Sequence, residues 1–158
     1  MRPASPTLTA AGGFAPLALY RGLLGAANRI PLSLPQLAAR VALAQVFWNS
    51  GQSKLASPEI TAQLFAMEYQ VPLIPPEIAA PLATATELGG ALLLFLGLFT
   101  RLGALMLLGM VAVIQIFVYP GHWGEHLMWA SMLLLLLARG AGKLSLDYLA
   151  SRFWPAKA

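Results

Sequence analysis

An acidic residue inside an apolar segment is the sharpest chemical feature of the sequence. Glu87 lies near the middle of the apolar segment 77–99. An ionisable group at that depth in a membrane is costly, so it is a candidate functional residue. A structural role is equally compatible, because Thr84, Gly90 and Ala91 lie beside it at helical spacing and are typical of a helix–helix contact. In that case a hydrogen-bonded Glu87 would hold two helices together.

A second group of candidate residues lies in the segment GHWGEHL. His122, Glu125 and His126 are spaced as H-x-x-E-H, which is formally the inverted zinc-protease motif. That motif requires a helix from its first histidine, whereas Pro120 and Gly121 predict a junction between a loop and a helix. We therefore predict no metal site. Glu125 is expected to cap the loop, and His126 is a candidate proton carrier or ligand.

Polar side chains from four apolar segments are expected at comparable depth. In the first segment, Gln45, Asn49 and Gln52 recur at positions i, i+4 and i+7 and share one helix face. Amides that faced lipid would lack partners, so this face is expected to turn toward protein or a cavity. The predicted catalytic groups are Glu87 and His126, and the predicted cofactor-binding groups are Asn49, Gln52, Gln115, Tyr119 and Trp48.

This combination of side chains would suit a quinone ring. Amides supply donors for the two quinone carbonyls, and Trp48 and Trp129 supply flat apolar walls. The core of a helix bundle is a usual place for such a site. The alternative is an interhelical hydrogen-bond network without a ligand, in which each contact contributes about 0.6 kcal/mol. The sequence leaves both interpretations open.

Composition indicates that lipid surrounds the chain. Of its 158 residues, 58% are hydrophobic and only 10% are charged, whereas soluble domains carry about 25% charged residues. A soluble fold with so little charge would expose large apolar patches. The absence of cysteine excludes disulfides and iron–sulfur clusters held by this chain. The net charge of +4 comes from basic residues that flank apolar segments, so we predict contact with lipid headgroups and no nucleic-acid binding.

The length of the apolar segments predicts the fold. From Ala79 to Tyr119 the chain is almost continuously apolar. One helix of that length would measure about 60 Å, twice the hydrocarbon thickness, so the chain must fold back at Thr100 and Arg101. The predicted fold is an all-α membrane protein whose four transmembrane helices lie near 35–55, 77–99, 102–119 and 123–138.

Three regions complete the predicted organisation. Residues 1–34 form a cytoplasmic tail with an interfacial helix at 14–30, residues 35–139 form the transmembrane bundle, and residues 140–158 form an amphipathic tail. The loop 56–76 is expected to contain a short amphipathic helix around 59–69. Ser145 is expected to cap the last helix.

The distribution of basic residues predicts orientation. With four spans, one side receives nine basic residues and the other only Lys54, so both termini are expected on the cytoplasmic side. Lys54 is expected to extend outward or to pair with an acidic residue of the outer segment: Glu59, Glu68 or Glu77. The nine are Arg2, Arg21, Arg29, Arg40, Arg101, Arg139, Lys143, Arg152 and Lys157.

Four stretches in this order resemble the DoxX family of small bacterial membrane proteins. They are RVALAQVFWNSGQSKL at 40–55, ELGGALLLFLGLFTRLGAL at 87–105, EH at 125–126 and GAGKLSLDYL at 140–149. The resemblance implies a four-helix bundle in the bacterial inner membrane. It also implies that Lys54, Glu87, Glu125, His126 and Asp147 occupy recurrent polar positions of the family.

The residues and the resemblance together lead to two hypotheses of function, with a transporter or channel as a third. Members of the family are linked to a thiosulfate:quinone oxidoreductase subunit, to quinone or oxidative-stress responses and to gene clusters for metal-handling peptides. One hypothesis is a redox membrane subunit with a quinone site, and it is based on the polar side chains that the four segments place at comparable depth. The other is a non-catalytic scaffold that anchors a protein partner or forms a homo-oligomer, because the sequence contains no complete catalytic motif.

Overall fold

The computed structural model describes residues 15–69, 71–72 and 74–153, and all regular secondary structure in these ranges is helical. The chain divides into two units, Met1–Pro31 and Leu32–Ala158. In the first unit, α1 (Ala15–Ala27) forms within the segment predicted as an interfacial helix. The predicted tail at 1–13 lies outside the described residues. The second unit contains the bundle and the candidate site.

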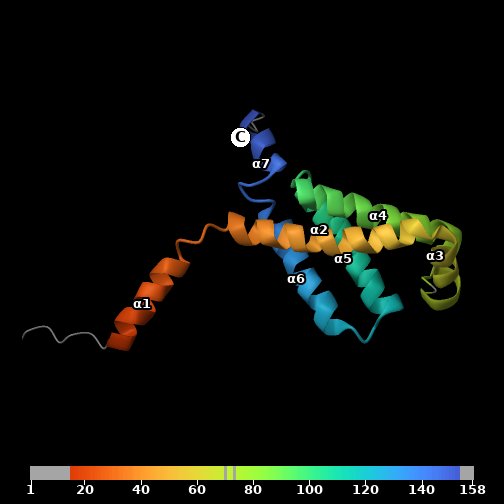
Figure 1. The fold of residues 1–158 in the computed structure, drawn as a ribbon, viewed down its shortest axis with the longest axis horizontal. Helices are drawn as coiled ribbons and strands as arrows, with labels where there is room; N and C mark the ends of the chain where they lie inside the picture. The colour runs from red at the N-terminus through yellow and green to blue at the C-terminus, as the bar shows by residue number, and fades with distance from the viewer. Residues whose placement is uncertain (1–14, 70, 73, 154–158) are drawn as a thin grey trace, which may run out of the picture. The chain divides into compact units, whose positions relative to one another are not determined.

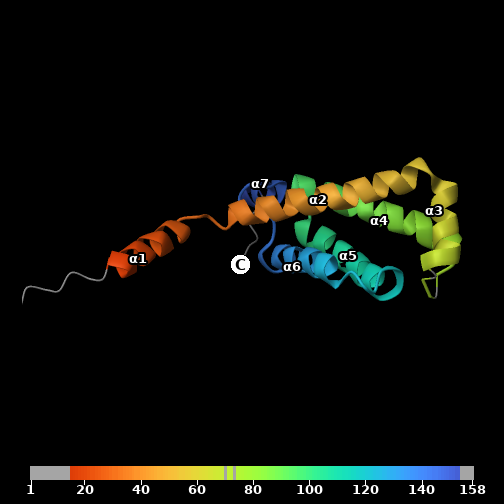
Figure 2. The same ribbon diagram turned by 60° about the horizontal axis from the view of Figure 1, so that its bottom comes forward.

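Four helices form the bundle of the second unit (Figure 1). They are α2 (Ser33–Ala56), α4 (Pro76–Leu96), α5 (Thr100–Val113) and α6 (Trp123–Arg139). Helix α2 packs most extensively on α4, α4 packs on α5, α5 packs on α6, and α6 returns to α2. Figure 2 shows α2 and α4 on one side of the unit and α5 and α6 on the other.

Shorter helices connect and extend the bundle. Between α2 and α4, α3 (Pro58–Leu64) continues into the π-helical turn η1 (Phe65–Tyr69), which confirms the short helix predicted in this loop. Helix α5 continues as a second π-helical turn, η2 (Ile114–Val118). After α6, Ser145 Oγ accepts a hydrogen bond from the Tyr148 backbone N–H at 3.2 Å. Ser145 thus caps α7 (Leu146–Phe153), as predicted.

When η2 is counted together with α5, the helix boundaries agree with the four predicted segments to within three residues at every end. Among the described residues, two helical segments are long and apolar enough to cross a membrane, Pro76–Leu96 and Thr100–Val118. Polar side chains lower the apolar character of α2, and α6 has 17 residues, slightly fewer than a full span requires. The structure therefore confirms four packed helices and an all-α fold.

Leucine and alanine side chains fill the centre of the bundle, and small residues bring the helices close together. A Cβ atom at Gly51 would lie 2.6 Å from Leu88 Cγ, and one at Gly90 would lie 2.6 Å from Leu107 Cγ. Glycine at these two positions therefore permits the close approach of α2 to α4 and of α4 to α5. The buried core includes Leu43, Phe47, Leu94, Leu107, Leu133 and Leu136.

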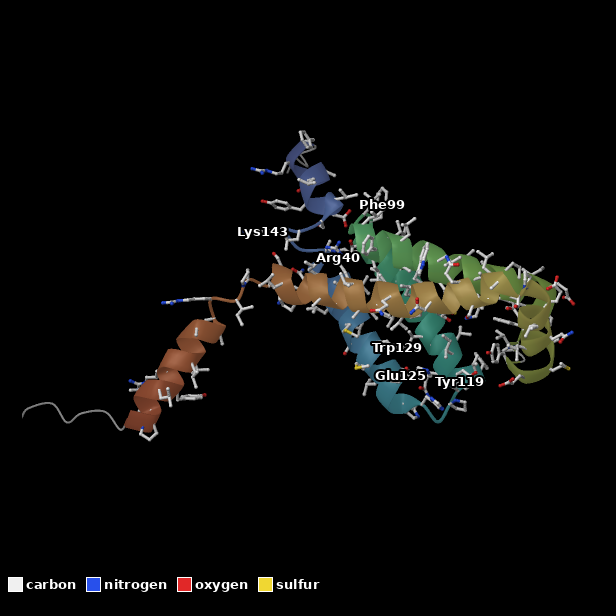
Figure 3. All side chains as sticks on the ribbon, in the orientation of Figure 1. Arg40, Phe99, Tyr119, Glu125, Trp129 and Lys143 are labelled. Carbon is white, nitrogen blue, oxygen red and sulfur yellow. The ribbon has the colours of Figure 1, made fainter. Side chains whose placement is uncertain are left out.

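A buried arginine fixes one end of the bundle (Figure 3). Arg40 on α2 is 2% exposed and donates hydrogen bonds to the last carbonyls of α4, from Nε to Leu94 at 2.7 Å and from Nη2 to Phe95 at 2.8 Å. Its Nη1 donates to the carbonyls of Ala141 and Leu144. The last carbonyls of a helix lack partners within it, so Arg40 satisfies them. Its charge is buried in protein rather than turned toward headgroups, contrary to expectation.

Asp147 completes this end by capping the next helix. Its carboxylate accepts hydrogen bonds from the backbone N–H groups of Phe99 at 2.7 Å and Thr100 at 2.9 Å, at the start of α5. A carboxylate is favourable there because the first N–H groups of a helix carry partial positive charge and lack partners. The stretch that follows α6 thus closes the turn between α4 and α5.

The outer surface of the bundle is apolar. Phe95 on α4 is 61% exposed, Leu102 on α5 is 54% exposed, and Leu127 on α6 is 62% exposed. Large apolar side chains on the outside of several helices at once are typical of a surface that meets lipid or another protein.

We predict that Gly97→Ala destabilises the bundle, whereas Gly89→Ala does not. Gly97 has φ +64°, and a Cβ there would lie 2.5 Å from Arg40 Nη2. The left-handed backbone alone costs a non-glycine residue about 1–2 kcal/mol. Gly89 lies within α4 with nothing within 4 Å of its Cβ position, so alanine there should stabilise by roughly 0.5–1 kcal/mol. Thermal unfolding in detergent measures both, and equal effects would contradict the assigned role of Gly97.

Candidate ligand-binding site

A cavity of about 830 Å³ lies between the helices and is mostly apolar. Residues from α2, α3, η1, α4, α5, η2 and α6 line it. Its polar lining includes two sets of side chains, one centred on Glu87 and one on His126. The site therefore combines the two residues that the sequence predicted as catalytic.

A buried ion pair forms the first polar set. Lys54 Nζ donates to Glu87 Oε1 at 2.9 Å and to Oε2 at 2.8 Å, and also to Ser50 Oγ at 2.7 Å. The side chain of Glu87 is 2% exposed and that of Lys54 is 18% exposed. The expectation that Lys54 extends outward or pairs with Glu59, Glu68 or Glu77 is wrong. A buried carboxylate requires a counter-charge, and the last turn of α2 brings Lys54 to it.

A histidine–glutamine pair forms the second set. His126 Nδ1 lies 2.6 Å from Gln115 Oε1, and Gln115 Nε2 donates to the carbonyl of Pro120 at 2.8 Å. Because a carbonyl only accepts, the Gln115 amide presents its oxygen to the ring, and Nδ1 of His126 is the donor. The neutral imidazole therefore keeps its lone pair on Nε2. His126 is 4% exposed and lines the cavity, so Nε2 is the nitrogen left for a ligand.

Both π-helical turns contribute side chains to the cavity lining. Gln115 belongs to η2 and Tyr69 to η1, and the Tyr69 hydroxyl lies 3.4 Å from that of Tyr119, directly after η2. Burial and the contact with Tyr119 raise the pKa of the Tyr69 phenol, so Tyr69 stays protonated near neutral pH. Single π-helical turns of this kind are frequent at functional sites.

Aromatic rings form a continuous row along the cavity. Ring centroids are 6.0 Å apart for Tyr69 and Tyr119, 5.4 Å for Tyr119 and His122, and 6.2 Å for His122 and His126. The row continues from His126 to Trp129 at 5.4 Å and from Trp129 to Phe47 at 5.7 Å. Such a wall favours a flat apolar ring by stacking and edge contacts.

The structure does not bring all predicted binding residues to the cavity. Glu87, His126 and Tyr119 line it, and Gln115 positions the imidazole of His126. In contrast, Trp48, Asn49 and Gln52 are exposed and lie outside the cavity lining. Gln45 is exposed on the same side of α2. Within the described part of this chain the polar stripe faces neither protein nor the cavity, contrary to expectation, because the inner side of α2 is occupied by its packing on α4 and α6.

The described residues contain no group of three or more side chains suited to a metal ion. His122 Nδ1 and Glu125 Oε2 are 4.0 Å apart, and both side chains are more than half exposed. Glu125 lies in the first turn of α6, where no side-chain capping hydrogen bond forms, and this geometry lends no support to the zinc-protease interpretation.

Sequence reasoning missed several residues of the site, of which three bear on its chemistry. Phe47 and Tyr69 line the cavity, and Ser50 accepts a hydrogen bond from Lys54. Phe47 and Ser50 flank the polar stripe in sequence but face the opposite side of α2. Tyr69 lies in the segment between α2 and α4, where no periodic pattern indicates a buried position. The one useful signal is that Ser50 and Lys54 are four residues apart and therefore share a face of α2.

Comparison with known proteins identifies relatives of this sequence. The profile of the DoxX family matches residues 36–120, which contain most of α2 and all of α4 and α5. A protein of Haemophilus influenzae, described as uncharacterized, is 31% identical over 130 residues, covering 77% of this chain and 86% of the relative. No solved structure matches the chain significantly.

We predict strong coupling between Lys54 and Glu87. Lys54→Met or Glu87→Gln alone leaves one charge buried without its partner and should cost about 3–5 kcal/mol. The double variant removes both charges and should recover much of that loss, giving a non-additive double-mutant cycle. Thermal or denaturant unfolding in detergent measures it. Additive losses would show that the two groups do not form a pair in the folded protein.

Proposed function

The chain belongs to the DoxX family of membrane proteins, and from this premise we propose that it is a membrane subunit of a quinone-linked redox system. In this proposal a quinone ring binds in the cavity between α2, α4, α5 and α6. The carrying observation is that Glu87 and His126, from different helices, are both buried at the wall of one largely apolar cavity.

Helix packing supports four membrane spans. Helices α4 and α5 with η2 meet the length and composition of a span. Helix α2 lies against α4, and its Gly51 is level with Leu88, near the middle of Pro76–Leu96. Helix α6 packs on α5 and α2. All four therefore share one depth in our proposal. The excess of basic residues at the Arg40 end favours both termini on the cytoplasmic side of a bacterial inner membrane.

The cavity offers what a quinone ring requires. Trp129 and Phe47 present aromatic surface, and the cavity is large enough for a drug-sized ring system. A bound quinone would supply two-electron, two-proton chemistry, with electrons exchanged with a partner redox protein. His126 Nε2 and the Glu87 carboxylate would accept hydrogen bonds from the two hydroxyl groups of the reduced ring, and they would take up its protons when the ring is oxidised. Gln115 fixes the tautomer of His126, and Lys54 supplies the counter-charge of Glu87.

We predict that purified protein binds the reduced (quinol) form of a short-chain naphthoquinone or benzoquinone analogue and that His126→Ala weakens this binding about ten-fold or more, since a hydrogen bond to a ligand contributes about 1–2 kcal/mol. Leu127→Ala is the matched control, because Leu127 follows His126 on α6 but is 62% exposed on the outside. Isothermal titration in detergent measures both affinities.

Two further outcomes decide the proposal. If the intact protein binds none of these analogues, the quinone site is absent. If His126→Ala and Leu127→Ala bind equally well while Glu87→Gln also keeps full affinity, the ligand lies elsewhere and the cavity assignment is wrong. Unfolding curves of each variant show whether a loss of binding is accompanied by a loss of the fold.

A further inference from the structure

A row of small and amide side chains runs along the exposed face of α2. The spacings between its members alternate between four and three residues, which is the heptad pattern of a helix that packs on another in a left-handed pair. None of the three carboxamides in the row has a hydrogen-bond partner within the described part of the chain. The members of this row, which we call the amide seam, are Ala38, Ala42, Gln45, Asn49, Gln52 and Ala56.

The depth of the amide seam makes its exposure costly. Gly51 lies within contact distance of Leu88, and Lys54 pairs with Glu87, so residues 45–52 of α2 are level with the middle of α4. If α4 spans the bilayer, the three amides lie within the hydrocarbon. Unpaired polar groups there cost several kcal/mol each, because no water is available to them. The amides therefore require a partner outside this chain.

Large apolar side chains flank the seam on one side. They recur every seven residues, at Leu34, Val41, Trp48 and Leu55, and their exposed fractions lie between 42% and 56%. A ridge of large residues beside a groove of small ones is the surface that a second helix of the same kind can fit closely. The seam and the ridge together form a shaped helix face rather than a uniform lipid-facing one.

The chemistry of the amides points to a second copy of this chain. A carboxamide carries both donors and acceptors, so asparagine and glutamine can pair with identical side chains, which carboxylates or ammonium groups of one sign cannot do. Copies inserted in one membrane have the same orientation, and a two-fold axis along the membrane normal would place each α2 residue opposite its equivalent. An asparagine at a heptad core position favours a two-stranded pair.

We infer that the protein forms a parallel homodimer through the amide seam of α2, with Gln45, Asn49 and Gln52 hydrogen-bonded to their equivalents in the second copy. This inference rests on the four-span arrangement proposed above and does not require a quinone site. The dimer leaves the cavity accessible, because the lining residues of α2 lie on its opposite side.

Single-cysteine cross-linking tests the inference, since the sequence contains no cysteine. Asn49→Cys and Ala42→Cys each place a thiol at a heptad core position, where oxidation in native membranes should link two chains. Trp48→Cys is the matched control beside Asn49, displaced from the core of the seam. Leu105→Cys is a second control on α5, where the native residue is 55% exposed. Disulfide-linked dimer at 42 and 49, with little at 48 and 105, is the expected result.

A second measurement does not depend on cross-linking. Replacing Gln45, Asn49 and Gln52 together with leucine should weaken the dimer roughly twenty-fold, since each amide contact contributes about a three-fold factor and leucine is solvated equally well by lipid. Subunit counting by single-molecule photobleaching at graded protein-to-lipid ratios measures the change. Unaltered dimerisation of this variant, or equal cross-linking at all four positions, would overturn the inference.

The accessibility of the thiol at position 49 distinguishes a failure of the dimer inference from a failure of the proposed membrane arrangement. If Asn49→Cys reacts with a membrane-impermeant maleimide in sealed vesicles, α2 faces water and the four-span proposal itself is wrong. If the thiol is shielded but no dimer forms, only the self-association through the amide seam is wrong. Cross-linking to a different protein at 49, without self-linking, would assign the seam to a foreign partner and likewise overturn the homodimer.

Discussion

The ion pair between Lys54 and Glu87 is the interaction on which the candidate site depends. It joins the last turn of α2 to the middle of α4 and places a charged pair at the wall of an otherwise apolar cavity. Such a pair contributes little net stability, because desolvation of two charges offsets most of their attraction. It does fix the register of the two helices, since any sliding of α2 along α4 would leave Glu87 buried without a counter-charge. Conformational specificity and a polar site thus arise from one contact.

A second cation on α2 determines the opposite end. Arg40 binds the terminal carbonyls of α4, and Asp147 caps α5, so the turn between these helices is held by groups distant in sequence. The two ends consequently differ in character. Around Arg40 the guanidinium donors are satisfied by backbone carbonyls, and the packing leaves no room at Gly97 even for a methyl group. Around Glu87 the polar groups border a cavity, which is where a ligand can change their protonation or pairing.

The sequence predicted the helices well because their causes are local. The length of each apolar stretch defines a helix. Gly97, Pro120 and Gly140 lie shortly after the ends of α4, η2 and α6. Glu87 and His126 were also identified, since charge inside an apolar segment is visible without coordinates. The direction of a helix face was not predictable in the same way. Spacing shows that Gln45 and Asn49 share a face, but it cannot show whether the first packing partner of α2 lies on that side. The prediction that Lys54 extends outward or pairs with an acidic residue of the outer segment was wrong for the same reason.

The polarity of α2 also explains why hydropathy alone does not identify this helix as a membrane span. A lipid-facing helix must be apolar around most of its surface, whereas a helix with protein on two sides can carry polar groups on both. On its inner side α2 carries Arg40 and Lys54, each paired with neighbouring helices. On its outer side it carries amides that lack partners within the described residues. If the outer side of α2 has no partner, α2 is the least stable span of the bundle. If a second copy covers that side, α2 is the span most fully surrounded by protein. The expectation that intramembrane amides face protein therefore applies to the assembly rather than to the single chain.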